Sequence, residues 1–133
     1  MPIPDLIPIA YEEGYRTDKV GRYNGGQFFA SAWDRHAYMH LFDRDGTYRE
    51  SKIIPIPAGA ALGTTLDGLV SKLPGMVKCD ITVRLFQIES DGVLFGLLDE
   101  SGDRTGDDVH TDWVELYPDG LGFTAPWDGF YST

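Results

Sequence analysis

The feature that most constrains how this chain can fold is a recurring pair of residues that favours tight turns. Asp45-Gly46, Asp91-Gly92 and Asp119-Gly120 each separate two short runs rich in β-branched, aromatic or aliphatic residues, and Asn24-Gly25 is a further pair of this kind. Glycine adopts positive φ without a steric cost, so these pairs are typical of hairpin turns. The chain is therefore predicted to form consecutive antiparallel strands.

The runs between the turns define the expected strands. Aromatic residues make up 13% of the chain, and their large rigid side chains favour strands and fill cores. The almost wholly apolar run at 93–98 is expected to lie centrally in its sheet. Strands are predicted over residues 16–23, 27–33, 36–42, 47–54, 77–88, 93–98, 110–117 and 121–124.

One short helix is expected over 66–73. Apolar residues there recur at positions i, i+3, i+4 and i+7, which is the pattern of an amphipathic helix. Thr64 or Thr65 can cap its N-terminus, and Pro74-Gly75 ends it. The preceding segment, 55–63, is rich in proline and glycine and is predicted to be a loop.

These elements predict an α+β, strand-dominated fold, in which a twisted antiparallel sheet of about six to eight strands carries one short helix. The 133 residues fit one domain and suffice to bury a core without a disulfide or a metal. This single domain, 1–133, is expected to begin with an extended, proline-containing lead-in at 1–16 and to end with an aromatic tail at 125–133.

The charge balance narrows the class of partner. The chain carries 21 acidic and 11 basic residues, which give a formal net charge of −10 at pH 7. A chain of this charge repels phosphate backbones and attracts basic surfaces. We therefore expect a protein partner with a basic surface and no direct binding to nucleic acid.

Three features favour the cytoplasm and argue against a membrane. The N-terminus lacks the basic region and the long apolar run of a signal peptide. No stretch approaches about 18 consecutive apolar residues. Cys79 is the single cysteine, which suits a reducing compartment, and we expect it to be a buried, inert thiol inside the 77–88 strand.

Two segments are candidate contact surfaces. The loop at 99–112 concentrates carboxylates but lacks the ligand spacing of a calcium-binding hand, so we interpret it as a solvated loop on which a basic partner docks. The aromatic residues near the C-terminus either close the core or expose an aromatic surface to a partner. The predicted partner-binding residues are Asp99, Glu100, Asp103, Asp107, Asp108, Asp112, Trp113, Trp127, Phe130 and Tyr131.

No motif indicates catalysis. The sequence has no Gly-x-Ser-x-Gly elbow and no Gly-Lys-Ser/Thr phosphate loop, so no catalytic residue, metal or cofactor is predicted. His36 and His40 would lie about 13 Å apart on one strand, which is too far to share a metal ion. The alternative hypothesis is a small enzyme or a ligand- or metal-binding protein whose pocket is lined by His36, His40, His110 and the acidic loop.

Both ends of the chain also carry a family resemblance. The residues concerned are EEGYRT at 12–17, GRY at 21–23, GQFFAS at 26–31, LYPDGLGF at 116–123, PWDG at 126–129, and Tyr131. They resemble a family of small bacterial proteins labelled formate hydrogenlyase regulatory protein-like. The resemblance implies a stand-alone protein of this size with a regulatory role, and it supplies no catalytic residues.

The functional expectation is a non-catalytic protein-binding module of the bacterial cytoplasm. One form of it is a regulator that acts through a partner protein. The other is an immunity protein that neutralises a toxin, because a small acidic protein suits a target that binds nucleic acid through a basic surface.

Overall fold

Two central strands are covered on both faces, and the rest of the fold is arranged around them. The computed structural model describes residues 3–101 and 112–131. The central strands are β3 (Gly26–Trp33) and β4 (His36–Phe42), which form a hairpin inside a five-stranded antiparallel sheet of order β5-β4-β3-β2-β6. The other strands of this sheet are β2 (Val20–Tyr23), β5 (Tyr48–Pro55) and β6 (Val77–Lys78).

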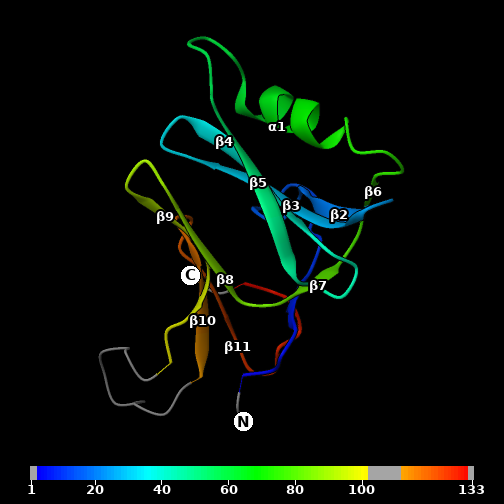
Figure 1. The fold of residues 1–133 in the computed structure, drawn as a ribbon, viewed down its shortest axis with the longest axis vertical. Helices are drawn as coiled ribbons and strands as arrows, with labels where there is room; N and C mark the ends of the chain where they lie inside the picture. The colour runs from blue at the N-terminus through cyan, green and yellow to red at the C-terminus, as the bar shows by residue number, and fades with distance from the viewer. Residues whose placement is uncertain (1–2, 102–111, 132–133) are drawn as a thin grey trace.

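The remaining strands form two further antiparallel sheets. A four-stranded sheet has the order β11-β10-β9-β8, and a two-stranded sheet pairs β1 with β7. Figure 1 shows the helix on one side of the five-stranded sheet and the four-stranded sheet on the other. The bounds are β1 (Ile7–Ile9), β7 (Ile81–Val83), β8 (Phe86–Ser90), β9 (Val93–Asp99), β10 (Trp113–Tyr117), β11 (Leu121–Thr124) and α1 (Leu62–Val70).

The alternation of side chains along β3 and β4 explains the two layers. Successive residues of a strand point to opposite faces. On β3, Phe28 belongs to the cluster packed against the helix, whereas Phe29 belongs to the cluster between the sheets. On β4, Met39 belongs to the cluster packed against the helix, and Tyr38 belongs to the cluster between the sheets. Both strands are therefore buried on two sides over most of their length, which accounts for the apolar residues at consecutive positions, such as Phe28-Phe29 and Tyr38-Met39.

The strand-dominated α+β class is confirmed, with antiparallel pairing throughout the described strands and a single helix among the described residues. The described strands number eleven and are divided among three sheets instead of lying in one. The 93–98 run lies inside its sheet as predicted, because β9 pairs with both β8 and β10. Among the described residues, no helix is both long enough and apolar enough to cross a membrane.

The helix begins four residues earlier than predicted and ends three residues earlier, before Pro74-Gly75 is reached. It spans Leu62–Val70, its N-cap is Ala61, and no side chain caps it. The hydroxyl of Thr65 donates instead to the carbonyl of Ala61, 3.1 Å away, so this threonine lies inside the first turn and not before it. The extension adds Leu62, Gly63, Thr64 and Thr65 to the helix, of which only Leu62 is a good helix former. The predicted apolar face is retained, since Leu66, Leu69 and Val70 are buried.

The prediction of one continuous strand over 77–88 is wrong. This segment contains β6, β7 and β8, and each belongs to a different sheet. Polar contacts fix the breaks, because the carboxylate of Asp80 accepts a hydrogen bond from the amide of Tyr11 and the amide of Arg84 donates to the carbonyl of Gly46. Cys79 lies at the first break and is partly exposed, so its predicted burial is also wrong.

Two of the predicted strands begin later in the structure than the sequence indicates. The strand predicted over 16–23 begins at Val20, because residues 12–18 form turns in which the amides of Tyr15 and Asp18 donate to carbonyls three residues earlier. The lead-in is therefore extended only in part, with β1 inside it. The strand predicted over 110–117 begins at Trp113, and the start of that prediction lies outside the described residues.

Candidate binding site

Two tight hairpin turns of similar geometry lie on one side of the molecule (Figure 1). The β3–β4 turn consists of Asp34 and Arg35, with φ of 50° and 61°. The β8–β9 turn consists of Asp91 and Gly92, with φ of 51° and 78°. Positive φ at both loop positions is the signature of the type I′ turn, which favours asparagine or aspartate followed by glycine. Arg35 is therefore an unusual occupant of its position.

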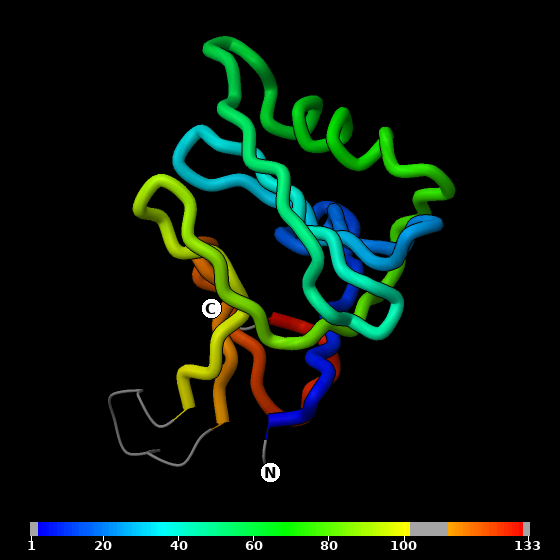
Figure 2. The backbone as a smooth tube through the Cα atoms, in the orientation of Figure 1, coloured from blue at the N-terminus to red at the C-terminus, as the bar shows by residue number. Residues whose placement is uncertain are grey.

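The two turns come from different sheets, yet their bends lie side by side (Figures 1 and 2). A hollow of about 230 Å³ lies between them, and we call it the inter-hairpin pocket. Both hairpins and β5 contribute to its walls. The lining residues are Trp33, Asp34, His36, Ile53, Ser90, Asp91, Val93 and Phe95.

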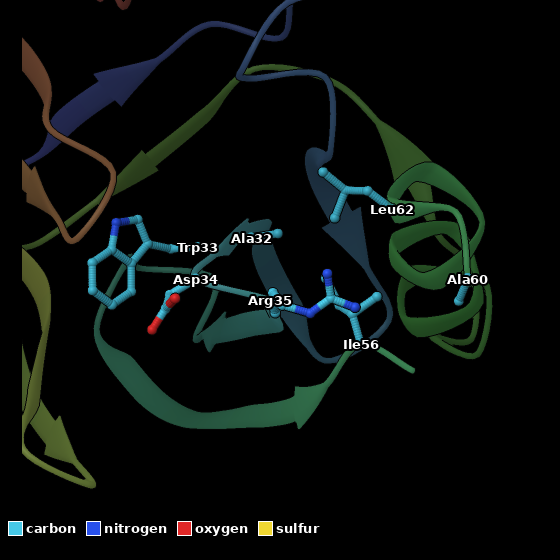
Figure 3. Close-up of a pocket in the computed structure, with 7 residues that line it drawn as sticks. All are labelled: Ala32, Trp33, Asp34, Arg35, Ile56, Ala60 and Leu62. Atoms are coloured by element: carbon cyan, nitrogen blue, oxygen red, sulfur yellow. The ribbon is translucent and has the colours of Figure 1, made fainter. Parts of the chain in front are cut away.

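A second hollow, of about 260 Å³, lies on the other side of the β3–β4 turn, toward the helix. Figure 3 shows that Trp33 and Asp34 lie together on one side of the turn, whereas Arg35 extends to the other side, toward Ile56. Leu62, at the start of the helix, lines this hollow too. Trp33 and Asp34 thus line both hollows, whereas Arg35 lines the helix-side hollow and not the inter-hairpin pocket.

Exposed apolar side chains gather around these hollows. Trp33 is 43% exposed and lines both of them. Leu62 is exposed at the helix start and lines the second hollow. Ile54 is exposed on β5 and lines neither hollow, but it lies next to Ile53, which lines the inter-hairpin pocket. Apolar residues concentrated in one area of a surface indicate an interaction site. We define the hairpin-tip surface as Trp33–His36, Ile54, Leu62 and Asp91.

A hydrogen bond orients the ring of His36, whereas the carboxylates at the two turns have no basic partner among the described residues. The Nδ1 atom of His36 lies 2.9 Å from the carbonyl oxygen of Asp34, and because a carbonyl only accepts, the proton of this bond is on the ring nitrogen. Neither Asp34 nor Asp91 forms an ion pair with any residue in the described part of the chain. Both carboxylates are therefore available to a ligand.

His40 does not reach this surface. It is fully buried in the aromatic cluster between the sheets, and its Nδ1 atom lies 2.6 Å from the hydroxyl oxygen of Ser51. Burial lowers the pKa of His40 to about 3, because desolvation disfavours the charged ring. His36 and His40 thus do not line a common pocket, and His110 lies outside the described residues. Within 3–101 and 112–131, no group of three or more His, Cys, Asp or Glu side chains could hold a metal ion.

A buried carboxyl fastens the β10–β11 turn to the five-stranded sheet. The hydroxyl of Ser31 donates to Oδ2 of Asp119 at 2.6 Å, and the guanidinium of Arg16 donates to the backbone carbonyl of Asp119 at 2.7 Å. Burial raises the pKa of Asp119 to about 6, against the opposing effect of these two partners. The carboxyl and the backbone of Asp119 thus hold two segments of the chain together.

The described members of the predicted acidic surface are partly engaged in local bonds. Asp99 accepts from the amide of Ser101 at 2.9 Å, and Glu100 accepts from the hydroxyl of Tyr117 at 2.6 Å. The carbonyl of Asp112 accepts from the hydroxyl of Thr124 at 2.6 Å. Asp103, Asp107 and Asp108 lie outside the described residues.

The predicted aromatic residues divide between core and surface. Trp113 is only 8% exposed, and its ring nitrogen donates to Glu115 at 3.1 Å. Trp127 and Tyr131 are partly buried against the cluster between the sheets. Phe130 is 55% exposed. The tail therefore folds back over the core and leaves one aromatic ring at the surface.

Sequence reasoning did not single out the hairpin-tip surface. The signal was present, since Asp34-Arg35 is a two-residue gap between runs that were both predicted as strands. It was missed because arginine is not a turn-forming residue and the pair lacks glycine. A comparison of the chain with protein-family models, with curated proteins and with solved structures finds no match in any of the three.

Proposed function

We propose that this protein is a non-catalytic protein-binding module of the cytoplasm that contacts a basic partner through the hairpin-tip surface. The observation that carries the proposal is the β3–β4 turn, in which a half-exposed Trp33 precedes Asp34 and Arg35. Tryptophan and arginine are among the residues most enriched at the positions that dominate the energy of protein interfaces.

The backbone of this turn supports a role for its side chains. A non-glycine residue at positive φ costs on the order of 1–3 kcal/mol in strain. Glycine at position 35 would relieve that strain, as Gly92 does in the other hairpin. Folding alone would therefore favour glycine, so the arginine side chain is expected to serve an interaction.

The sizes of the two hollows beside the turn suit contacts with a protein partner at this surface. The two hollows beside the turn measure about 230 and 260 Å³. Sites for small molecules usually measure about 300–1,000 Å³. Hollows below that range suit individual side chains of a partner better than a whole substrate or cofactor.

The charge of the chain supports a basic partner. With a net charge of −10, the protein attracts basic surfaces and accelerates their association at low salt. The acidic segment 99–112 and the exposed Phe130 remain proposed secondary contacts. Either a regulator acting through its partner, as the family resemblance implies, or an immunity protein that neutralises a basic toxin would act through such a contact.

Affinity capture with matched variants tests the proposal. We expect the wild-type protein to retain a basic protein from the native lysate, in a salt-sensitive manner. We expect Trp33→Ala to weaken binding of that protein at least tenfold, as is usual for a central aromatic contact. The control is Val77→Ala, which truncates an exposed aliphatic residue on β6, an edge strand of the same sheet.

The dissociation constant of the recovered protein is then measured by calorimetry with each variant. Equal affinity of the Trp33→Ala variant and the wild type would refute the proposed surface. Toxicity of the recovered protein on its own, relieved by co-expression of this chain, would assign the immunity role, and its absence would favour the regulatory role.

A further inference from the structure

The inter-hairpin pocket has a specific chemical character. Its walls combine two carboxylates, Asp34 and Asp91, with two aromatic rings, Trp33 and Phe95. Among the described residues that line it, none is a lysine or an arginine. This combination of negative charge and aromatic surface is the one that recognises organic cations.

The protein's own cation is directed elsewhere. Arg35 follows Asp34 directly, but its side chain extends toward Ile56 on the helix side of the turn (Figure 3). Trp33 and Asp34 lie together away from the Arg35 guanidinium in Figure 3, and they line the helix-side hollow as well as the inter-hairpin pocket. Neither carboxylate forms an ion pair with Arg35 or with any other residue in the described part of the chain.

The backbone places the two carboxylates equivalently. Each aspartate is the first residue of a two-residue turn with positive φ. The last paired residues before the turns are Trp33 with His36 and Ser90 with Val93. Two hairpins from different sheets thus each bring one carboxylate to the same pocket.

We propose that the inter-hairpin pocket receives an arginine side chain of the partner protein. Its guanidinium binds between the carboxylates of Asp34 and Asp91 and packs on the indole of Trp33, while its methylene groups contact Phe95. This inference rests on the proposed function and names the chemistry of its contact. The pocket volume of about 230 Å³ suits one long side chain.

Arginine fits these walls better than lysine. Its guanidinium is planar, stacks on aromatic rings and binds carboxylates through two parallel hydrogen bonds. It is also less strongly hydrated than an ammonium group, so it enters a partly apolar hollow more readily. We therefore expect an arginine compound to bind the pocket more tightly than its lysine counterpart, and a neutral compound of the same shape not to bind.

The test uses N-acetyl-arginine amide as the probe, with N-acetyl-lysine amide and the neutral N-acetyl-citrulline amide as comparisons. Binding is followed by the amide and indole N–H resonances of the protein, and the Trp33 indole signal is assigned by its absence from the Trp33→Phe spectrum. We expect saturable shifts at Trp33–His36 and at 90–95 with the arginine probe, smaller shifts with lysine and none with citrulline.

Asparagine substitutions provide the decisive variants. Asp34→Asn and Asp91→Asn remove the charges and keep the positive φ, which asparagine adopts readily. We expect each to weaken binding of the arginine probe about tenfold, as for a close charge pair. The matched control is Asp45→Asn, in the β4–β5 turn, where asparagine can still accept the bond from the Thr47 amide. Shifts that persist in the Asp34→Asn, Asp91→Asn double variant, or that are as large with citrulline, would overturn the inference.

The failure of this inference is distinguishable from failure of the proposed function. Partner binding that is lost in Trp33→Ala but unchanged in the double asparagine variant would reject the arginine pocket and keep the binding surface. Localised arginine shifts without any partner that depends on Trp33 would support the pocket chemistry and reject the proposed surface.

Discussion

Asp34 and Asp91 occupy the same position in two hairpin turns that belong to different sheets, and both side chains line one pocket. Neither aspartate is needed to connect its strands, because asparagine serves that position equally well. Their convergence on a pocket with Trp33 and Phe95 is what distinguishes this side of the molecule from the β4–β5 turn, whose Asp45 bonds locally to Thr47.

Replacement of Arg35 by glycine should stabilise the fold and weaken partner binding. Arg35 has a φ of 61°, which glycine adopts without strain. We expect Arg35→Gly to raise the free energy of unfolding by about 1 kcal/mol. The relieved backbone strain stabilises the folded state, and the greater conformational entropy of glycine in the unfolded chain offsets part of this gain. Urea unfolding measures this change, and a lower stability of the variant would show that the arginine side chain supports the fold itself.

The buried His40 should make stability fall as the pH falls. In the native state burial lowers the pKa of His40 to about 3, whereas the ring in the unfolded chain takes up a proton near its ordinary pKa of 6.5. Below pH 6.5 the unfolded state thus binds more protons, and the free energy of unfolding decreases by up to about 1.4 kcal/mol per pH unit. His40→Phe should remove this decrease, which urea unfolding at pH 6.5, 5.5 and 4.5 measures relative to wild type.

Asp119 should have the opposite effect and increase the free energy of unfolding as the pH falls. Burial raises its native pKa to about 6, against the ordinary value of 3.8 for an aspartate in the unfolded chain. Between about pH 6 and 4 the native state therefore binds more protons, so this group increases stability on acidification by a similar slope. Asp119→Asn should consequently lose stability more steeply than wild type between pH 6 and 4. Profiles of both variants that run parallel to that of the wild type would contradict both assignments.

Gln27 should be a strong determinant of stability because its side chain acts as a strand partner. It is 2% exposed, its amide nitrogen donates to the carbonyl of Thr82 at 2.8 Å, and its oxygen accepts from the Thr82 amide at 2.8 Å. Gln27→Leu would leave two backbone groups of Thr82 without these bonds, at a cost of about 2–3 kcal/mol. Gln87→Leu, at an exposed position of β8, is the control. Equal effects of the two substitutions on the urea midpoint would rule out this role.

The hairpins were predictable from the sequence because their signals are local. Asn24-Gly25 and Asp91-Gly92 connect the paired strands that flank them, as predicted. The segment 77–88 was not predictable in this way, because it leaves one sheet and enters the next without glycine or proline. Contacts between residues far apart in the chain, such as Tyr11 with Asp80, decide where its strands break.

The candidate site was less accessible to sequence reasoning than the fold. Composition indicated an acidic, aromatic-rich protein, which favoured the acidic loop and the tail as contact surfaces. The inter-hairpin pocket instead depends on the packing of two sheets, which brings residue 34 beside residue 91. Trp113 and Trp127 were candidates as aromatic residues, yet burial engages most of their surface in the core.

Site-specific photo-cross-linking in the native host tests the binding surface most directly. A photoreactive phenylalanine analogue replaces either Ile54 or Val77, which are exposed aliphatic residues on the two opposite edge strands, β5 and β6, of one sheet. We predict one discrete cross-linked protein from position 54 and none from position 77. A cross-link from position 77 with none from position 54 would contradict the hairpin-tip surface as the site of contact.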